Sequence, residues 1–345
     1  MNVRKFIGVT AALAVLYLSV GSNVSADEGS FPPLPEALAA MKSNLSVKVS
    51  TITVPTWNDP DNYYYAFEPR RKQQNLGFII YPGAYVDPQS YAPAAQEIAK
   101  AGYLVFIVKM PGDLAIVGIP RALDILAAYP DTTQWVIGGH SLGGVSASGY
   151  VKDHPDKMKG VVLWASYGSD VFTIHDSDVR VIVLFGTKDG LATPAKVEAG
   201  KPYLPDNTTY IPIEGGNHTN FGYYDTSPDP VQPGDNSSDI TRKDQQKIIV
   251  AETLALLDGI SGREPGACPA VAILGEDDPG IATLRQFRDT VLANSALGNK
   301  LIDSYYNNGS VITGFIERNP AVRSSAQTVI RLLLPAVQRI LAAGK

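Results

Sequence analysis

Residues 135–150 read Trp135-Val136-Ile137-Gly138-Gly139-His140-Ser141-Leu142-Gly143-Gly144-Val145-Ser146-Ala147-Ser148-Gly149-Tyr150. A short apolar run is followed by glycines and then by small residues, and the centre has the spacing G-x-S-x-G. A sharp turn from a strand into a helix strains the backbone, and only neighbours without bulky side chains permit it. The stretch therefore predicts that the Ser141 hydroxyl stands at a helix N-terminus, where free N–H groups favour a developing negative charge.

Short apolar runs and helical segments alternate around this stretch. The runs are rich in β-branched and aromatic residues, as in strands buried on both faces. Expected strands lie at 76–81, 103–108, 135–137, 160–164, 179–185 and 208–213, and expected helices at 88–100, 117–129, 142–153, 194–199 and 241–257. Residues 46–54 and 62–67 predict an antiparallel hairpin at the sheet edge. The fold class is therefore α/β, with a mostly parallel sheet covered by helices on both faces.

Two motifs resemble those of a known family. The serine stretch resembles the G-G-H-S-L-G-G of small bacterial members of the α/β-hydrolase family. Gly215-Gly216-Asn217-His218-Thr219-Asn220-Phe221-Gly222 is similar to that family's histidine loop, G-G-N-H-x-x-F-G. The resemblance covers residues 46–257 and implies an α/β-hydrolase fold with a nucleophile, an acid and a base in that chain order. Ser141 is then the expected nucleophile.

The expected acid follows the most strand-like run, residues 179–185. Asp189 lies in the turn after it, where the family carries its acid. Asp170, Asp176 and Asp178 are competitors, but they precede that strand and are expected in a loop on the opposite side. Asp189 could also be an ordinary turn residue that caps a glycine bend.

The chain has four histidines, which narrows the choice of base. His140 lies inside the serine motif and is expected to point away from the hydroxyl. His154 precedes a proline at a helix end, and His175 lies in a loop. His218 remains, because it follows the last expected strand and resembles the family's histidine.

The resemblance also implies an oxyanion hole, a pair of N–H groups that binds the negatively charged oxygen of the transition state. The first donor is the backbone of Leu142, directly after the nucleophile. The second is the backbone of Ala84, in the loop after the expected strand 76–81. The alternative for that loop is an ordinary Pro-Gly turn.

These assignments predict two-step acyl transfer to water, with an acyl-enzyme intermediate on Ser141 and no cofactor or metal. Only residues 165–178 are available where relatives carry a cap domain, so we expect an open cleft that suits a small-molecule acyl substrate, namely small esters. Its rim is expected to include Tyr85, Trp164, Tyr167, Phe221, Tyr223 and Tyr224. The sequence leaves open an amidase or peptidase with the same triad and a non-catalytic envelope scaffold or interaction protein. Residues 225–238 could be read as a calcium loop, but they lack EF-hand spacing, and a solvated loop is favoured.

Composition and the N-terminus restrict the partners and the location. The formal net charge of −5 and the absence of a basic run with aromatics argue against nucleic acid. Residues 1–26 have two early basic residues, an apolar run and a small-residue cleavage site, as in a secretory signal peptide. An uncleaved anchor is the alternative, although the run is short for a span. We therefore expect export, periplasmic or extracellular, with no membrane span after cleavage and no internal disulfide, because Cys268 is the only cysteine.

The expected domains after the signal peptide are an α/β-hydrolase domain at 27–260 and a small all-helical C-terminal module at 261–345. Helices are expected at 281–292, 297–306, 311–316 and 322–341. The module is similar to one found on diverse exported bacterial proteins, through Cys268-Pro269-Ala270-Val271-Ala272, Leu284-Arg285-Gln286-Phe287-Arg288-Asp289 and Ile302-Asp303-Ser304-Tyr305-Tyr306. Residues 329–341 could rest on a membrane surface, but core packing also explains their apolar positions. No feature of the sequence indicates the oligomeric state.

Overall fold

The computed structural model describes residues 30–70, 74–262, 269–275, 278–292, 295, 297–298, 301, 305 and 309–343. The chain divides into two compact units, Met1–Ser261 and Gly262–Lys345. The expected signal peptide, residues 1–26, and Cys268 lie outside the described residues. None of the described helices is long and apolar enough to cross a membrane.

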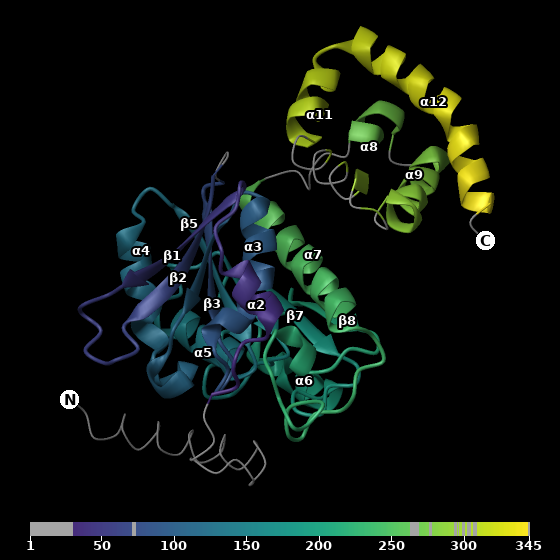
Figure 1. Ribbon diagram of the computed structural model, residues 1–345. Helices are drawn as coiled ribbons and strands as arrows, with labels where there is room; N and C mark the ends of the chain where they lie inside the picture. Colours follow the sequence, from purple (N-terminus) through teal and green to yellow (C-terminus); the bar gives the residue numbers. More distant parts are fainter. Residues whose placement is uncertain are drawn as a thin grey trace. The chain divides into compact units, whose positions relative to one another are not determined.

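An eight-stranded sheet forms the centre of the first unit, in the order β1-β2-β4-β3-β5-β6-β7-β8 (Figure 1). Its strands are β1 (Val47–Thr53), β2 (Tyr63–Pro69), β3 (Leu76–Tyr81), β4 (Leu104–Val108), β5 (Gln134–His140), β6 (Gly160–Trp164), β7 (Arg180–Gly186) and β8 (Thr209–Ile213). β1 pairs antiparallel with β2 and β2 pairs antiparallel with β4, whereas all later pairings are parallel. The predicted hairpin and mostly parallel sheet are confirmed.

Helices cover both faces of the sheet, as the alternating pattern predicted. On one face, α3 (Ala92–Lys100) and α7 (Arg242–Ser261) pack against strand side chains such as Phe78. The other face, which includes the neighbouring Ile79, is covered by α4 (Ala122–Ala128), α5 (Leu142–Asp153) and α6 (Pro194–Gly200). A short helix, α2 (Pro35–Ala40), precedes β1 and contacts α3. Because successive residues of a strand face opposite ways, fully apolar strands supply both cores.

Two expected helices begin later than the pattern suggested. The segment 88–100 starts with the 3-10 turn η1 (Pro88–Tyr91) before α3. The segment 117–129 starts in the 3-10 turns η3 (Ala115–Val117) and η4 (Ile119–Arg121), and only then becomes α4. Pro93 and Pro120 lack an N–H and so cannot donate a helical hydrogen bond to an earlier carbonyl, which is why the α-helical hydrogen bonds begin only after them.

The second unit is helical, as predicted. Its helices are α8 (Pro269–Leu274), α9 (Pro279–Thr290), α11 (Gly309–Glu317) and α12 (Pro320–Ala343), and Pro335 lies inside α12. Most of the helix expected at 297–306 falls outside the described residues. Among the described residues of this unit, the buried apolar cluster is small and consists of Ala270, Ile273, Leu274, Ile281 and Ile316.

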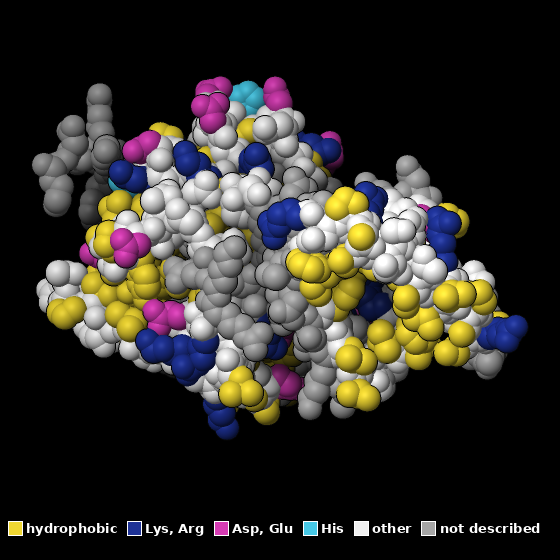
Figure 2. Space-filling view, turned by 90° about the horizontal axis from the view of Figure 1, so that it is seen from above, with side chains coloured by type: hydrophobic (Ala, Val, Ile, Leu, Met, Phe, Trp, Pro, Cys, Tyr) yellow, Lys and Arg dark blue, Asp and Glu magenta, His cyan; other side chains and the backbone are white. Residues whose placement is uncertain are grey.

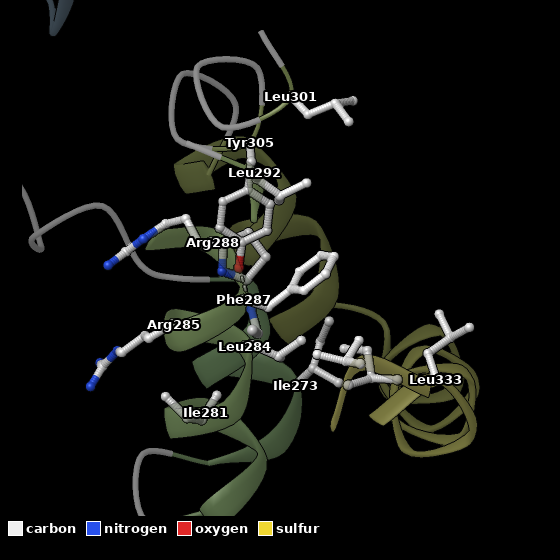
Figure 3. A pocket seen from close by; sticks show the side chains of 14 residues that line it. Ile273, Ile281, Leu284, Arg285, Phe287, Arg288, Leu292, Leu301, Tyr305 and Leu333 are labelled. Carbon is white, nitrogen blue, oxygen red and sulfur yellow. Dashed lines mark hydrogen bonds between the residues drawn. The ribbon is translucent and has the colours of Figure 1, made fainter. Parts of the chain in front are cut away.

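Side chains of α8, α9 and α12 surround an apolar cavity of about 490 Å³ in this unit (Figure 3). Ile273, Leu284 and Phe287 belong to its lining, and Arg285 and Arg288 extend away from these apolar side chains. Hydrophobic side chains also gather on the surface of the unit (Figure 2), and those exposed on α12 are Val322, Val329, Leu332, Leu333 and Ile340.

Candidate active site

Ser141 lies between β5 and α5 in a backbone conformation that is rare for a residue with a side chain. Its φ is 53° and its ψ is −121°. Positive φ is uncommon outside glycine and persists only where the surroundings fix it. Here the Ser141 N–H donates to the Trp164 carbonyl at 2.9 Å, and the Ser141 carbonyl accepts from Ser166 Oγ at 2.9 Å. The adjacent strand β6 and the residues after it therefore hold the turn in place.

Close backbone contacts explain the glycines around Ser141. A Cβ atom on Gly139 would lie 2.3 Å from the Tyr81 carbonyl oxygen, and one on Gly143 would lie 2.0 Å from the same atom. A Cβ on Gly144 would lie 2.6 Å from Ser166 Cβ. The first turn of α5 therefore packs directly against the end of β3, which no larger residue at these positions would allow.

The loop after β3 lies beside the start of α5. A Cβ on Gly143 would also lie 2.5 Å from the Pro82 carbonyl oxygen. The Gly83 N–H donates to Tyr91 Oη at 2.9 Å. Leu142 and Ala84, the two expected oxyanion donors, have N–H groups that donate no hydrogen bond to any other described residue. The Leu142 and Ala84 N–H groups, neither of which donates to a described residue, therefore come from two segments that contact each other.

Asp189 lies in the turn after β7, and its side chain is fully buried. Its Oδ1 accepts hydrogen bonds from the N–H groups of Leu191 at 2.8 Å and Ala192 at 2.7 Å. Its Oδ2 lies 2.9 Å from Nδ1 of His218. Each carboxylate oxygen is therefore held by the protein, which fixes the orientation of the group that faces His218.

His218 follows β8, and its imidazole is as buried as the Asp189 carboxylate. A carboxylate only accepts hydrogen bonds, so the proton shared with Asp189 belongs on Nδ1, which leaves Nε2 as the basic nitrogen. His218 Nε2 has no hydrogen-bond partner among the described residues, Ser141 Oγ included. Hydrogen bonds of this kind are often long in free enzymes and tighten when substrate binds.

His140 packs against His218, with ring centroids 4.5 Å apart. Its Nδ1 lies 2.9 Å from Tyr91 Oη, and its ring stacks on Phe221. Burial lowers the pKa of His140 well below its ordinary value, and the neighbouring His218 lowers it further. His140 is therefore a neutral, structural neighbour of His218. Through Tyr91 it connects His218 to Gly83, in the loop that holds Ala84.

The competing residues lie away from His218. Asp170, Asp176 and Asp178 are exposed in the connection between β6 and β7. His175, in the same connection, is exposed and its Nδ1 lies 3.0 Å from the Leu204 carbonyl oxygen. The structure thus brings Asp189 and His218 together and leaves the alternatives at the surface.

Three of the six aromatic residues expected at the rim of the cleft belong to the buried core instead. Trp164, Phe221 and Tyr224 are buried. The Trp164 indole N–H donates to Oγ1 of Thr253, a buried residue of α7, at 3.1 Å. The spacing of apolar residues in the sequence does not show whether an aromatic residue at the end of a strand lines the site or packs in the core. The partly exposed members, Tyr85, Tyr167 and Tyr223, are the remaining candidates for substrate contact.

Three polar residues that the sequence reasoning did not select support the histidine loop or the adjacent His140. Gln245, buried on α7, accepts from the Asn217 N–H at 3.1 Å and donates to its carbonyl at 2.8 Å. Tyr91 and Asp235 are the others. A glutamine on the buried face of the expected helix 241–257 was a usable signal, since buried polar groups need partners. Asp235 lies in a Pro-, Gly- and Ser-rich segment, where no feature of the sequence distinguishes it from the other polar residues.

The geometry of a strained serine turn with a buried Asp–His pair at later strand ends can be compared with known proteins. Residues 77–247 match the family model described as "Alpha/beta hydrolase family". This segment has the fold of an α/β hydrolase. No curated protein matches the chain.

Several solved structures resemble the hydrolase domain. Carboxyl esterase 2 from the mycorrhizal fungus Tuber melanosporum has 14% identity, covers 72% of this chain and 98% of its own, and gives a TM-score of 0.47. A predicted CIB-like hydrolase from Thermoplasma acidophilum has 15% identity, with 60% and 98% covered and a TM-score of 0.45. TT1662 from Thermus thermophilus has 13% identity, with 63% and 99% covered and a TM-score of 0.46.

The described residues hold no cluster of three or more His, Cys, Asp or Glu side chains that could bind a metal ion. The apolar cavity of the C-terminal unit is separate from this site, since its lining residues all lie between Pro269 and Val337. Among the described residues, the strand-end site is therefore the better candidate for chemistry, because it combines a serine hydroxyl, a buried Asp–His pair and unused N–H donors.

Proposed function

We propose that this hydrolase is an exported serine hydrolase that cleaves small esters through Ser141, Asp189 and His218. The observation that carries the proposal is the buried hydrogen bond between His218 Nδ1 and Asp189 Oδ2, which leaves Nε2 unbonded in the domain whose serine turn holds Ser141. A serine hydroxyl is a poor nucleophile at neutral pH and needs such a base.

In the first step Ser141 Oγ attacks the ester carbonyl while His218 Nε2 takes its proton. The C–O bond to the alcohol then breaks, and His218 returns the proton to the departing oxygen. In the second step His218 takes a proton from water as the water oxygen attacks the acyl-enzyme. The C–O bond to Ser141 then breaks, and His218 returns the proton to Ser141 Oγ as the acid leaves. Asp189 keeps the imidazole oriented and stabilises its charged form in both steps.

The oxyanion of each tetrahedral intermediate would lie between the N–H groups of Leu142 and Ala84. Neither group donates to an acceptor among the described residues, and donors of this kind typically lower the barrier by about 3 kcal/mol each. The Leu142 N–H also lies at the N-terminus of α5, where the helix dipole favours negative charge.

A small substrate is supported by the connection between β6 and β7. It contains no helix, so it supplies no cap over the serine turn. Tyr85, Tyr167 and Tyr223 offer partly exposed rings around the strand ends. A site without a helical cap and with these rings at its rim would suit short acyl groups better than long chains, which need an enclosing pocket.

The proposal is tested with the purified mature protein, an active-site fluorophosphonate probe and short acyl esters. We expect the wild type to be labelled and to turn over, and Ser141→Ala to do neither. Asp189→Asn and His218→Ala should each lower turnover by about three orders of magnitude or more while the fold is kept. Ser237→Ala, an exposed serine in the same unit, is the matched control and should behave as wild type.

Absence of labelling in the wild type, or equal labelling of Ser141→Ala, would refute the enzyme proposal and favour a non-catalytic envelope protein. Turnover of the matching amide at a comparable rate would favour an amidase or peptidase instead. Export is checked on the same preparation, because a secreted chain cleaved after residue 26 begins at Asp27 by N-terminal sequencing.

A further inference from the structure

Asp235 connects the two loops that carry the acid and the base. Its Oδ1 accepts hydrogen bonds from the Gly190 N–H at 3.0 Å and the His218 N–H at 3.2 Å. Its Oδ2 accepts from the Thr219 N–H at 2.8 Å and from Thr219 Oγ1 at 2.6 Å. One carboxylate therefore binds the residue after Asp189, His218 itself and the residue after His218.

The hydrogen-bonding capacity of this carboxylate is fully used. Two carboxylate oxygens offer about four acceptor positions, and all four donors around Asp235 are N–H or O–H groups of the two loops. An asparagine would place an NH₂ group against donors at one of these oxygens. The site therefore requires an aspartate specifically, and not merely a polar residue of that size.

Further contacts secure the segment that presents Asp235. The Gln232 N–H donates to Thr219 Oγ1 at 2.9 Å. On the other side, Asn236 Nδ2 donates to the Lys188 carbonyl at 3.0 Å, and the Asn236 carbonyl accepts from Asn217 Nδ2 at 2.8 Å. Residues 232–236 thus bridge the acid loop and the histidine loop. This segment, expected from sequence to be a solvated surface loop, is part of the support of the site.

We propose that Asp235 is a positioning residue that sets the placement of His218 relative to Asp189 and Ser141. It touches neither substrate nor the reacting atoms, so it acts through the backbone of His218. The kinetic part of this proposal rests on the serine hydrolase function proposed above. The positional part concerns the Asp189–His218 hydrogen bond itself and can be measured without turnover.

Asp235→Asn is the principal variant, because it keeps the size of the side chain and tests the acceptor requirement. We expect kcat for short esters to fall by about 100-fold, since an error of about 1 Å in a catalytic group can cost that much. KM should change little, because Asp235 is not a substrate contact. Thr219→Val, which removes one of the four donors, should give a smaller loss of the same kind.

Two readouts separate positioning from general destabilisation. The first is the proton NMR signal of His218 Nδ1–H, which the hydrogen bond to Asp189 shifts downfield and protects from solvent exchange. It should be sharp in the wild type and broadened or lost in Asp235→Asn at temperatures where both proteins are folded. The second is a double-mutant comparison, in which Asp235→Asn and Thr219→Val combined should lose less than the product of their separate effects.

Asp229→Asn is the matched control, because Asp229 is an exposed aspartate of the same loop and should leave kcat and the NMR signal unchanged. The proposal is overturned if Asp235→Asn keeps wild-type kcat and the sharp signal, if only KM rises, or if Asp229→Asn has the same effect. If the wild type itself fails to turn over esters, the proposed function fails, and the NMR comparison still decides whether Asp235 positions His218.

Discussion

The two neighbouring imidazoles of the site have different Nδ1 partners. His218 Nδ1 pairs with the Asp189 carboxylate and His140 Nδ1 with the hydroxyl of Tyr91, while Nε2 of both rings has no partner among the described residues. Burial lowers the pKa of His140, and the adjacent His218 adds to this effect. In the proposed mechanism, a neutral His140 places no second positive charge beside His218 when that residue takes the serine proton.

The lowered pKa of His140 predicts a pH-dependent stability. The unfolded chain binds a proton at His140 near the ordinary pKa of 6.5, but the folded protein does not until a lower pH. Stability therefore falls as pH drops below about 6.5, by up to about 1.4 kcal/mol per pH unit for one proton. Urea unfolding should show that His140→Asn has a shallower decline between about pH 7 and pH 5 than the wild type.

His175→Asn is the control for this measurement, because His175 is exposed and its removal should leave the slope of the wild type. An identical slope in His140→Asn and the wild type would contradict the prediction. The comparison uses the slope of the unfolding free energy against pH. Any cavity that His140→Asn creates lowers this free energy at every pH and so leaves the slope unaffected.

The sequence was sufficient to select the residues with recognisable motifs, such as His218, but not the residues that hold them in place through hydrogen bonds. Asp189 and His218 were predicted from their strand ends, and the structure brings them into hydrogen-bond contact. Their catalytic roles stay predictions until measured. Asp235 was missed because its four donors come from segments distant in sequence, and Trp164 was placed at the rim because its burial depends on α7. Such partners are fixed by tertiary structure alone.

At the scale of elements, the contact between α5 and the end of β3 depends on glycine. A methyl group at Gly143 would meet the Tyr81 carbonyl oxygen at 2.0 Å, and backbone cannot move aside as a flexible side chain can. We expect Gly143→Ala to lose about 3 kcal/mol of unfolding free energy, at the upper end for overpacking. It should also lose activity, because the shift would displace the Leu142 N–H.

Gly259→Ala is the matched substitution in another helix. In α7 the nearest atom to the added methyl is Arg180 Nη1 at 3.2 Å, the end of a flexible side chain. Alanine is also the better helix former, so stability should be unchanged or rise by up to about 1 kcal/mol. Thermal unfolding of both variants checks the pair, and equal stability of the two would contradict the explanation from close packing.

The elements themselves were largely predictable, because strands buried on both faces leave continuous apolar runs. All six runs expected as parallel strands are strands of the sheet. The helix starts were less predictable. The helical spacing of apolar residues extends through Pro93 and Pro120, so it predicts helices that begin too early. It carries no information about the missing proline N–H groups or about the 3-10 turns that precede α3 and α4.

At the scale of the molecule, every residue proposed for the chemistry lies in the first unit. Ser141, Asp189, His218 and Asp235 all precede Ser261, where α7 and the unit end. The second unit has its own, much smaller apolar cluster. Small cores stabilise weakly, so we expect it to unfold at a lower temperature than the hydrolase domain.

This division predicts that a chain from Asp27 to Ser261 folds and hydrolyses short esters with a kcat/KM close to that of the chain extending to Lys345. The sheet, both covering layers of helices and the four site residues are all retained in the shorter chain. Steady-state kinetics on both chains, with Ser141→Ala in each as the blank, checks the result. Calorimetry should show that the shorter chain lacks the lower-temperature transition and keeps the higher one. Loss of activity in a shorter chain that retains the higher transition would mean that the C-terminal unit takes part in the reaction.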